Sequence, residues 1–392
     1  MSTISNAFKK DRRAYFLVEL DFDGWKHRIS TSDQQIENAA GDPLLFQGLI
    51  KNQTLSIGSS FDFRSFRYSG PTVRIQMINT DRFQDNEIHH KLDAGTATIW
   101  LWSPSLDWTD IEDYPIYRGG VQKTGGRLSD TYSLDIVDFT LDRGQVINSF
   151  SQTGHPAEIL RVLLANKTRL AADHVDLGSV GGLRSVLPGW EFTSTVDAAA
   201  DAFDVVDRVA RQCWCARWQR HGRVGIVVLD PNGPAVGDLR DADFIGQAGE
   251  VFDSTPRDWI CNSVSAKYNY SGGSFGDTLT VDHTNNELCG QSLSDYGAQP
   301  QLSLSLADID SGYQARASVC RRLEFLAFRH DLFSCHVPYW RGWDLYEGDV
   351  ALITHADGPS TDGAGWDRER CILLDRKFNR TGINQTWWRI DV

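Results

Sequence analysis

The residues from Gly272 to Gly276 read GGSFG and match the pattern G-x-S-x-G, in which a serine can act as the nucleophile of a hydrolase. That chemistry requires a strand, a sharp turn and then a helix. The residues that follow, DTLTV, have the character of a strand instead. The pattern therefore predicts the tip of a hairpin at Gly272 and Gly273, and no nucleophile.

Sulfur and imidazole groups that could bind a metal are scattered along the chain. Cys213 and Cys215 are two residues apart, which is not the C-x-x-C redox spacing; on a strand they would share a face, which favours core packing. Cys335 and His336, with His330 nearby, could contribute to a zinc site, but no second pair stands at metal-ligand spacing. The odd number of cysteines predicts reduced thiols in a protein made in the cytosol, with an iron–sulfur or metal site assembled from distant cysteines as the alternative. The cysteines are Cys213, Cys215, Cys261, Cys289, Cys320, Cys335 and Cys371.

Two further stretches carry possible ligands. We expect His89 and His90 to lie in a solvated loop. Asp357, Asp362 and Asp367 offer the oxygens that calcium prefers, but their spacing lacks the regular alternation of an EF-hand and indicates a hairpin tip. No acidic pair stands out as an acid–base pair, and neither a phosphate loop nor a dinucleotide fingerprint occurs. We therefore predict no catalytic, cofactor-binding or metal-binding residue, no cofactor, and a protein that is not an enzyme.

The composition bounds the class of protein. A chain of 392 residues is long enough for two or three domains, and 13 Trp and 19 Phe against 2 Met favour β structure. The net charge of −13 disfavours binding to a phosphate backbone. The nearest approach to a basic run, residues 9–13, is predicted to be a solvated N-terminal arm. We expect no signal peptide, because the N-terminal residues lack an apolar stretch, and no membrane span, because no run of 18 apolar residues occurs.

The N-terminal residues have the pattern of many short strands. Residues 14–31 predict a hairpin around Asp23 and Gly24. In the stretch TVRIQMINTDRF, at 72–83, Val73, Ile75 and Met77 alternate as in a strand, which ends at the turn-forming residues Asn79, Thr80 and Asp81 before Phe83. Further strands are predicted at 97–105, 115–126 and 131–144. This spacing of strands and turns predicts a barrel or sandwich over residues 1–149.

The pattern changes near residue 150. Residues 154–166 predict a helix with Pro156 at its first position, and a loop is expected to run from there to Trp190. Residues 196–214 predict a second helix, followed by a hairpin that turns at His221 and Gly222. These elements predict an α/β module over residues 150–250.

The last part of the chain returns to β structure. Residues 259–283 predict a long hairpin, and strands are expected within 332–358 and 370–392. A third helix is predicted at 311–330. The residues expected on one face of that helix are Tyr313, Ala317, Cys320 and Phe328. We predict a second β domain over residues 251–392.

The order of four segments resembles the N-terminal barrel of a known family. VRIQMINTDRF, ATIWLWSPS, PIYRGGVQKTGG and YSLDIVDFTLDRG occur here in the order seen in the tail hub (baseplate hub) proteins of tailed bacteriophages and phage-like particles. WICNSVSAKYNY and YEGDVALITHADG resemble segments of the second barrel in that family. The similarity extends over most of the chain, and the order of the segments carries it.

The resemblance implies a fold and a function. It implies a mainly β chain with two tail-tube-like β-barrel domains separated by an α/β module. Three copies would form a ring that adapts the sixfold tail tube to the threefold tail tip and lines the DNA channel. The implied partners are a distal tail or tail tube protein on one side, tail tip or fibre proteins on the other, and the tape measure protein; DNA passes only transiently. The implied location is the virion tail tip, after assembly in the host cytoplasm.

Two alternatives stay open at this point. The chain could be a distal tail ring or receptor-binding tail protein, although two barrels in one chain favour the hub. It could also be a carbohydrate-binding module or a carbohydrate-active enzyme, because tryptophans can stack on sugars. Packing in a core or an interface is the simpler interpretation of these tryptophans. They are Trp100, Trp102, Trp108, Trp340 and Trp343.

Overall fold

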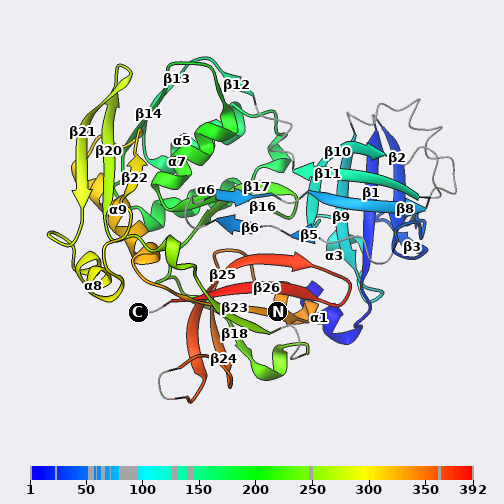
Figure 1. Cartoon of the computed structure of the whole chain (residues 1–392). Helices are drawn as coiled ribbons and strands as arrows, with labels where there is room; N and C mark the ends of the chain where they lie inside the picture. The colour runs from blue at the N-terminus through cyan, green and yellow to red at the C-terminus, as the bar shows by residue number, and fades with distance from the viewer. Residues whose placement is uncertain are drawn as a thin grey trace.

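The computed structural model describes most of the chain, and Figure 1 shows its three parts: an N-terminal sheet, a C-terminal sheet, and a part that contains most of the helices. The predicted fold class, mainly β with a smaller α/β part, is confirmed. The described residues are 2–22, 24–51, 57–58, 60–62, 67–70, 72–78, 95–125, 131–138, 145–246, 250–360 and 363–390.

Six strands near the N-terminus form one antiparallel sheet in the order β2-β1-β9-β10-β11-β8. The predicted hairpin is confirmed, since Phe22 pairs with Trp25 across its turn. The strands are β1 (Tyr15–Phe22), β2 (Trp25–Ser30), β8 (Val73–Ile78), β9 (Thr96–Trp102), β10 (Tyr117–Gly125) and β11 (Thr131–Asp138). Two pairs of short strands belong to this part of the sequence. β3 (Gln34–Glu37) pairs with β4 (Pro43–Phe46), which contacts β2, and β6 (Ser60–Asp62) pairs with β7 (Arg67–Ser69), which lie near residues 366–378 and 215–220.

Strand β8 has the alternation that its sequence predicts. Val73, Ile75 and Met77 are buried at 0–1% exposure, while the residues between them are not. The strand is the last in the strand order, next to β11, and residues 49–51 form backbone hydrogen bonds with its other side. The predicted turn at 79–81 with Phe83, and the pair His89 and His90, lie outside the described residues.

The C-terminal sheet has the order β18-β24-β25-β26-β23-β19, and β5 also pairs with β25. β18 runs parallel to β24 and the other pairs are antiparallel. The sheet therefore draws strands from both sides of residue 250, and the domain ranges given above stay a prediction. The strands are β5 (Ile57–Gly58), β18 (Ala235–Arg240), β19 (Val251–Ser254), β23 (Asp331–Val337), β24 (Val350–His355), β25 (Trp366–Phe378) and β26 (Ile383–Arg389).

The basic run at 9–13 is largely exposed, as predicted, but it is not a free arm, because Lys9 and Lys10 end a packed helix, α1 (Thr3–Lys10). The ring of Phe8 lies 5.1 Å from that of Tyr339 and 5.8 Å from that of Trp343. The hydroxyl of Ser5 donates a hydrogen bond of 2.8 Å to Asp344. The two sheets share one hydrophobic core, and α1 is part of it. Short helices in these regions are α3 (Trp108–Ile111), α10 (Tyr339–Gly342) and η3 (Asp241–Asp243).

The helical part confirms the helix at Pro156 and corrects two other predictions. Pro156 occupies the first turn of its helix. The expected loop before Trp190 contains a helix, because the Asp176 side chain accepts hydrogen bonds from two backbone N–H groups at its start. The predicted helix at 196–214 begins only at Ala202, since the residues before it form short strands. The helices are α5 (Pro156–Asn166), η2 (Ala172–His174), α6 (Leu177–Val186) and α7 (Ala202–Gln212). The strands are β12 (Val146–Ile147), β13 (Phe150–Gly154), β14 (Phe192–Val196), β15 (Ala200–Asp201), β16 (Cys215–Arg220) and β17 (Arg223–Val228).

A third small sheet packs against the helical part, and the two share a second hydrophobic core. The helix predicted at 311–330 is present, but the face predicted for it is wrong. Tyr313 is 81% exposed, whereas Ala315, Val319 and Leu323 are buried. The elements are β20 (Val264–Ser271), β21 (Ser274–Val281), α8 (Glu287–Tyr296), β22 (Leu302–Ser305), α9 (Gly312–Leu326) and η5 (Arg257–Trp259). None of the helices described is long and apolar enough to cross a membrane.

Candidate functional site

The serine of the G-x-S-x-G pattern lies on a hairpin, as predicted. Gly272 and Gly273 have φ values of +58° and +86° and form the turn between β20 and β21. Ser274 is the first residue of the strand that follows, and its hydroxyl donates to the carbonyl of Ser271 at 3.5 Å. The strand–turn–helix geometry of a nucleophile elbow is therefore not formed here.

The seven cysteines are free thiols, as predicted, and six of them are buried. Cys213 caps α7 and Cys215 begins β16, and both pack in the core, as predicted. Burial raises the pKa of both thiols. Among the described residues, no three His, Cys, Asp or Glu side chains gather in a way that could hold a metal ion.

The histidines and acidic residues considered as ligands have other surroundings. His336 on β23 contacts Asn384 at 2.6 Å, and the His330 ring lies 4.5 Å from that of Trp388. Asp357 and Asp367 are exposed in the hairpin that joins β24 to β25, and Asp362 lies outside the described residues.

Four of the five tryptophans considered for sugar stacking are buried, at 3–8% exposure: Trp100, Trp102, Trp108 and Trp343. The fifth, Trp340, is half-buried. The indole of Trp100 packs 5.1 Å from that of Trp108 and donates a hydrogen bond to the carbonyl of Glu112. The prediction of core packing is confirmed for these four residues, which present no open aromatic platform to a ligand.

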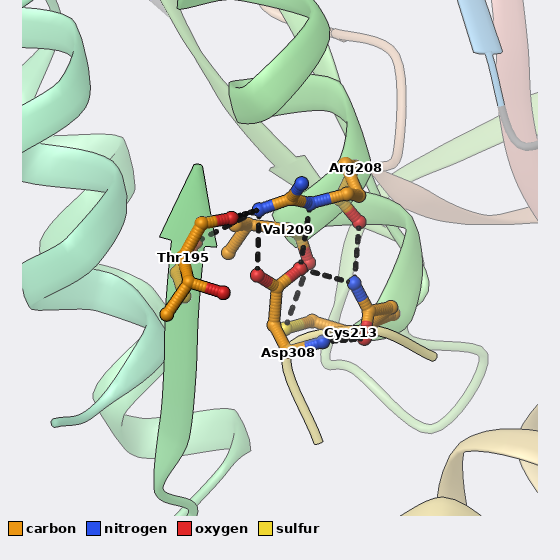
Figure 2. Close-up of polar contacts among 7 residues, drawn as sticks. Thr195, Arg208, Val209, Cys213 and Asp308 are labelled. Atoms are coloured by element: carbon orange, nitrogen blue, oxygen red, sulfur yellow. Dashed lines mark hydrogen bonds and ion pairs between the residues drawn. The ribbon is translucent and has the colours of Figure 1, made fainter. Parts of the chain in front are cut away.

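A fully buried carboxylate, Asp308, organises one polar cluster in the helical part. Figure 2 shows it facing Arg208 of α7, whose Nε and Nη2 atoms donate to the carboxylate at 3.1 and 2.9 Å. Gln212, one turn later, donates to the same carboxylate and accepts a hydrogen bond from its backbone N–H. Arg208 also donates to the carbonyl of Thr195, at 3.0 Å. We name Arg208, Gln212 and Asp308 the α7 cluster.

The α7 cluster joins segments that are distant in sequence. The carbonyl of Asp308 accepts a hydrogen bond of 2.9 Å from Thr193 at β14. The cluster thus ties the segment between β22 and α9 to both α7 and β14. The sequence contained no motif that marked Arg208 or Asp308, because they are a hundred residues apart.

A second cluster lies at the tip of the β16–β17 hairpin. Gln219 donates to the carbonyl of Arg118 at 2.8 Å and accepts from its N–H at 3.3 Å, so the hairpin is bonded to β10 of the N-terminal sheet. His221 contacts the hydroxyl of Tyr346 at 3.1 Å, on the segment before β24. The ring of Tyr114 meets the His221 ring edge-on at 5.1 Å. The hairpin tip therefore contacts all three parts of the molecule.

We name this second cluster the hairpin junction; it consists of Arg220, His221, Tyr346, Glu347 and Arg376. Two of its positive charges lie over the ring of Tyr346. The guanidinium carbons of Arg220 and Arg376 lie 3.1 and 4.4 Å from the ring centre of Tyr346. Arg376 also donates to Glu347 at 3.2 Å. Burial, together with the positive charges of Arg220 and Arg376, lowers the pKa of His221 to about 3. The imidazole is therefore neutral near pH 7.

Comparisons with known proteins identify the fold. No protein-family model matches the chain, and no curated protein matches it. The 43 kDa tail protein of prophage MuSo2 from Shewanella oneidensis superimposes with a TM-score of 0.50 at 9% identity, covering 95% of this chain and 98% of that one. The tail protein from Neisseria meningitidis MC58 has a TM-score of 0.48 at 11% identity, covering 96% of both chains. The likeness to the prophage MuSo2 protein shows that the chain has the fold of a phage tail protein, which confirms the resemblance at the level of the fold.

Proposed function

We propose that the chain is a structural protein of a phage tail and acts there as the tail hub. The observation that carries this proposal is that one chain forms two sheets around a shared core, within a fold similar to that of a prophage tail protein. If each sheet supplies one unit of a ring, three copies supply six units. Such a trimer matches a sixfold tube on one side and a threefold tip on the other.

The proposed partners follow from that position. A distal tail or tail tube protein would bind one face of the ring, and tail tip or fibre proteins the other, with the tape measure protein in the channel during assembly. DNA would cross the ring only during ejection. The net charge of −13 supports this proposal, because like charges repel and an acidic protein does not retain DNA. The protein would assemble in the host cytoplasm and act in the virion tail tip, without catalysis.

The oligomeric state of the purified chain tests the proposal. Light scattering should give the mass of a trimer, and negative-stain images of the same sample should show a ring with a central hole. A ring of six subunits would instead favour a distal tail protein. A chain that stays monomeric at high concentration, both alone and with a purified tail tube protein, would contradict the hub proposal.

A further inference from the structure

A groove lies between the start of β1 and the turn that joins β25 to β26. One cavity of about 280 Å³ has Arg12, Arg13, Thr31 and Arg380 in its wall. A second cavity of about 270 Å³ also has Arg12 and Thr381 in its wall, and we call the two adjacent cavities together the groove. Its first half is basic, in a chain whose net charge is −13.

Two of the arginines are available to a ligand. Arg13 binds Asp11, with a distance of 2.8 Å between Nη2 and the carboxylate. Arg12 and Arg380 are exposed, and within the described part of the chain neither forms a hydrogen bond or an ion pair. Positive charges without a carboxylate partner favour an anionic ligand, because each could donate several hydrogen bonds to it.

The backbone that carries Arg12 is held in place. Arg12 follows α1 and its C-cap residue Asp11, and α1 is fixed by the contacts of Phe8 with two aromatic rings and by the bond from Ser5 to Asp344. The N–H of Asp11 bonds to the carbonyl of Ala7 at 2.8 Å and ends the helix. The helix and its cap therefore hold this wall of the groove before any ligand binds.

The turn that carries Arg380 is equally well defined. The Asn379 side chain accepts hydrogen bonds from the N–H groups of Thr381 and Gly382, at 3.0 and 3.2 Å. The hydroxyl of Tyr339 donates to the carbonyl of Asn379. The backbone at Arg12 and at Arg380 is thus held by hydrogen bonds and packing, which lowers the entropic cost of binding.

The second half of the groove is mixed, with large apolar side chains beside Arg12, Asp243 and Thr381. It is lined by Phe8, Phe244, Ile245, Tyr339 and Trp340. Ile245 is 41% exposed, although it is a large aliphatic residue. The one acid in this wall, Asp243, already pairs with Arg341. An aromatic and aliphatic pocket of this kind anchors apolar side chains of protein partners.

We propose that this groove binds an extended peptide segment of a partner protein that carries Asp or Glu next to a large apolar residue. The carboxylates would meet Arg12 and Arg380, and the apolar side chain would enter the half lined by Trp340. A nucleic acid fits less well, because the acidic chain repels DNA at long range. The inference does not depend on the trimeric hub.

Selection of peptides on the intact chain tests this assignment. A displayed library of random dodecapeptides is enriched on the wild type, and the best binder is synthesised with a fluorescent label. We expect an acidic residue beside an apolar one in the enriched peptides. By anisotropy, Arg12→Glu and Arg380→Glu should each weaken binding at least about 10-fold, because each removes charge-assisted hydrogen bonds. Trp340→Ser should weaken binding as well.

The control is the double variant Arg161→Glu/Arg169→Glu, which changes exposed arginines in the helical part by the same charge as Arg12→Glu/Arg380→Glu. It should bind the peptide like the wild type, and all variants should keep the wild-type circular dichroism and Tm. Enrichment of no peptide, or of peptides that bind equally to Arg12→Glu/Arg380→Glu, would overturn the proposal. So would binding of a labelled 20-base-pair DNA duplex that depends on these arginines, or a change in oligomeric state in the same double variant.

Discussion

The α7 cluster and the hairpin junction bury charge in different ways. In the α7 cluster, Asp308 faces Arg208 and Gln212, so one negative charge meets a full set of donors. In the hairpin junction, two guanidinium groups lie against the ring of Tyr346, and the imidazole of His221 stays neutral. The first cluster is complementary in charge, and the second contains more positive than negative groups.

Their positions explain the difference. The α7 cluster lies within a single hydrophobic core, where an unpaired charge would be costly and close pairing compensates for lost solvation. The hairpin junction lies where three parts of the molecule meet, and its contacts come from β10, the β16–β17 hairpin and the segment before β24. We therefore expect the stability of the protein to depend on the side chains of the α7 cluster. At the hairpin junction we expect it to depend on the pH and on the backbone conformation of the turn.

The largest effect is expected from Asp308→Ala. The variant leaves the Arg208 guanidinium, which is 30% exposed, and the Gln212 amide without their carboxylate, so the free energy of unfolding should fall by about 2–4 kcal/mol. Urea denaturation followed by tryptophan fluorescence measures this loss. The matched control is Asp310→Ala, which removes an exposed carboxylate two residues away and should cost less than about 0.5 kcal/mol. Equal losses in the two variants would show that the α7 cluster contributes nothing special.

Acidification should affect the hairpin junction through His221. Its folded-state pKa of about 3 lies below the ordinary value of 6.5, so the unfolded chain binds the proton first as the pH falls. Stability is therefore lost from about pH 6.5 downward, by about 2 kcal/mol at pH 5. Urea denaturation of the wild type and of His221→Gln at pH 7, 6 and 5 gives the difference at each pH. A difference that stays constant with pH would contradict the prediction.

A substitution of the turn glycine should lower the stability of the protein more at the hairpin junction than at the exposed turn between β20 and β21. A Cβ atom at Gly222 would lie 2.6 Å from Cδ of Arg118, and its φ of +67° is unfavourable for alanine. Gly273 has a φ of +86° in an equivalent turn, but no atom lies within 4 Å of its Cβ position. Both changes to alanine should cost about 1 kcal/mol from backbone strain, and Gly222→Ala about 1 kcal/mol more. Thermal unfolding compares the two variants. Identical Tm values would show that the close contact between Gly222 and Arg118 does not affect stability.

The smallest effect concerns Asp375, a carboxylate on β25. Burial, and then the nearby charge of Glu347, raise the pKa of Asp375 to about 6. A raised pKa means that the folded state binds the proton more tightly, so the stability that this proton supplies is lost as the pH rises through 6. Asp375→Asn should therefore be more stable than the wild type by about 0.5–1 kcal/mol at pH 8 and no more stable at pH 5. Asp367→Asn, an exposed residue of the same strand, should change neither value.

Much of the local structure was predictable because short-range chemistry decides it. The turns at Gly24 and Gly272, the alternation in β8 and the helix that begins at Pro156 each follow from a few neighbouring residues. Helix α6 was missed because its sequence, LGSVGGLRSV, contains three glycines and has low helix propensity. The cap at Asp176 and the burial of Leu183 stabilise this helix. The burial of Leu183 depends on tertiary packing, which the sequence pattern does not show.

Helix α9 shows that the sequence also did not predict which face of a helix is buried. Apolar residues occur around much of this helix, so the sequence allowed a face with Tyr313 as well as one with Val319. Packing against β20 and β21 selects Val319 and leaves Tyr313 exposed. Helical periodicity therefore predicted the element but not its orientation.

The sequence by itself determined the mainly β class, most hairpins, the free thiols and the resemblance that the fold confirms. Only the tertiary structure decided which distant residues come together: Asp308 bonds to Arg208 in the α7 cluster, and Arg12 and Arg380 line one cavity of the groove. The physical reason is the distance in sequence over which each kind of interaction acts. Turns and alternation depend on bonds between near neighbours, whereas these contacts exist only after separate segments have packed around common cores.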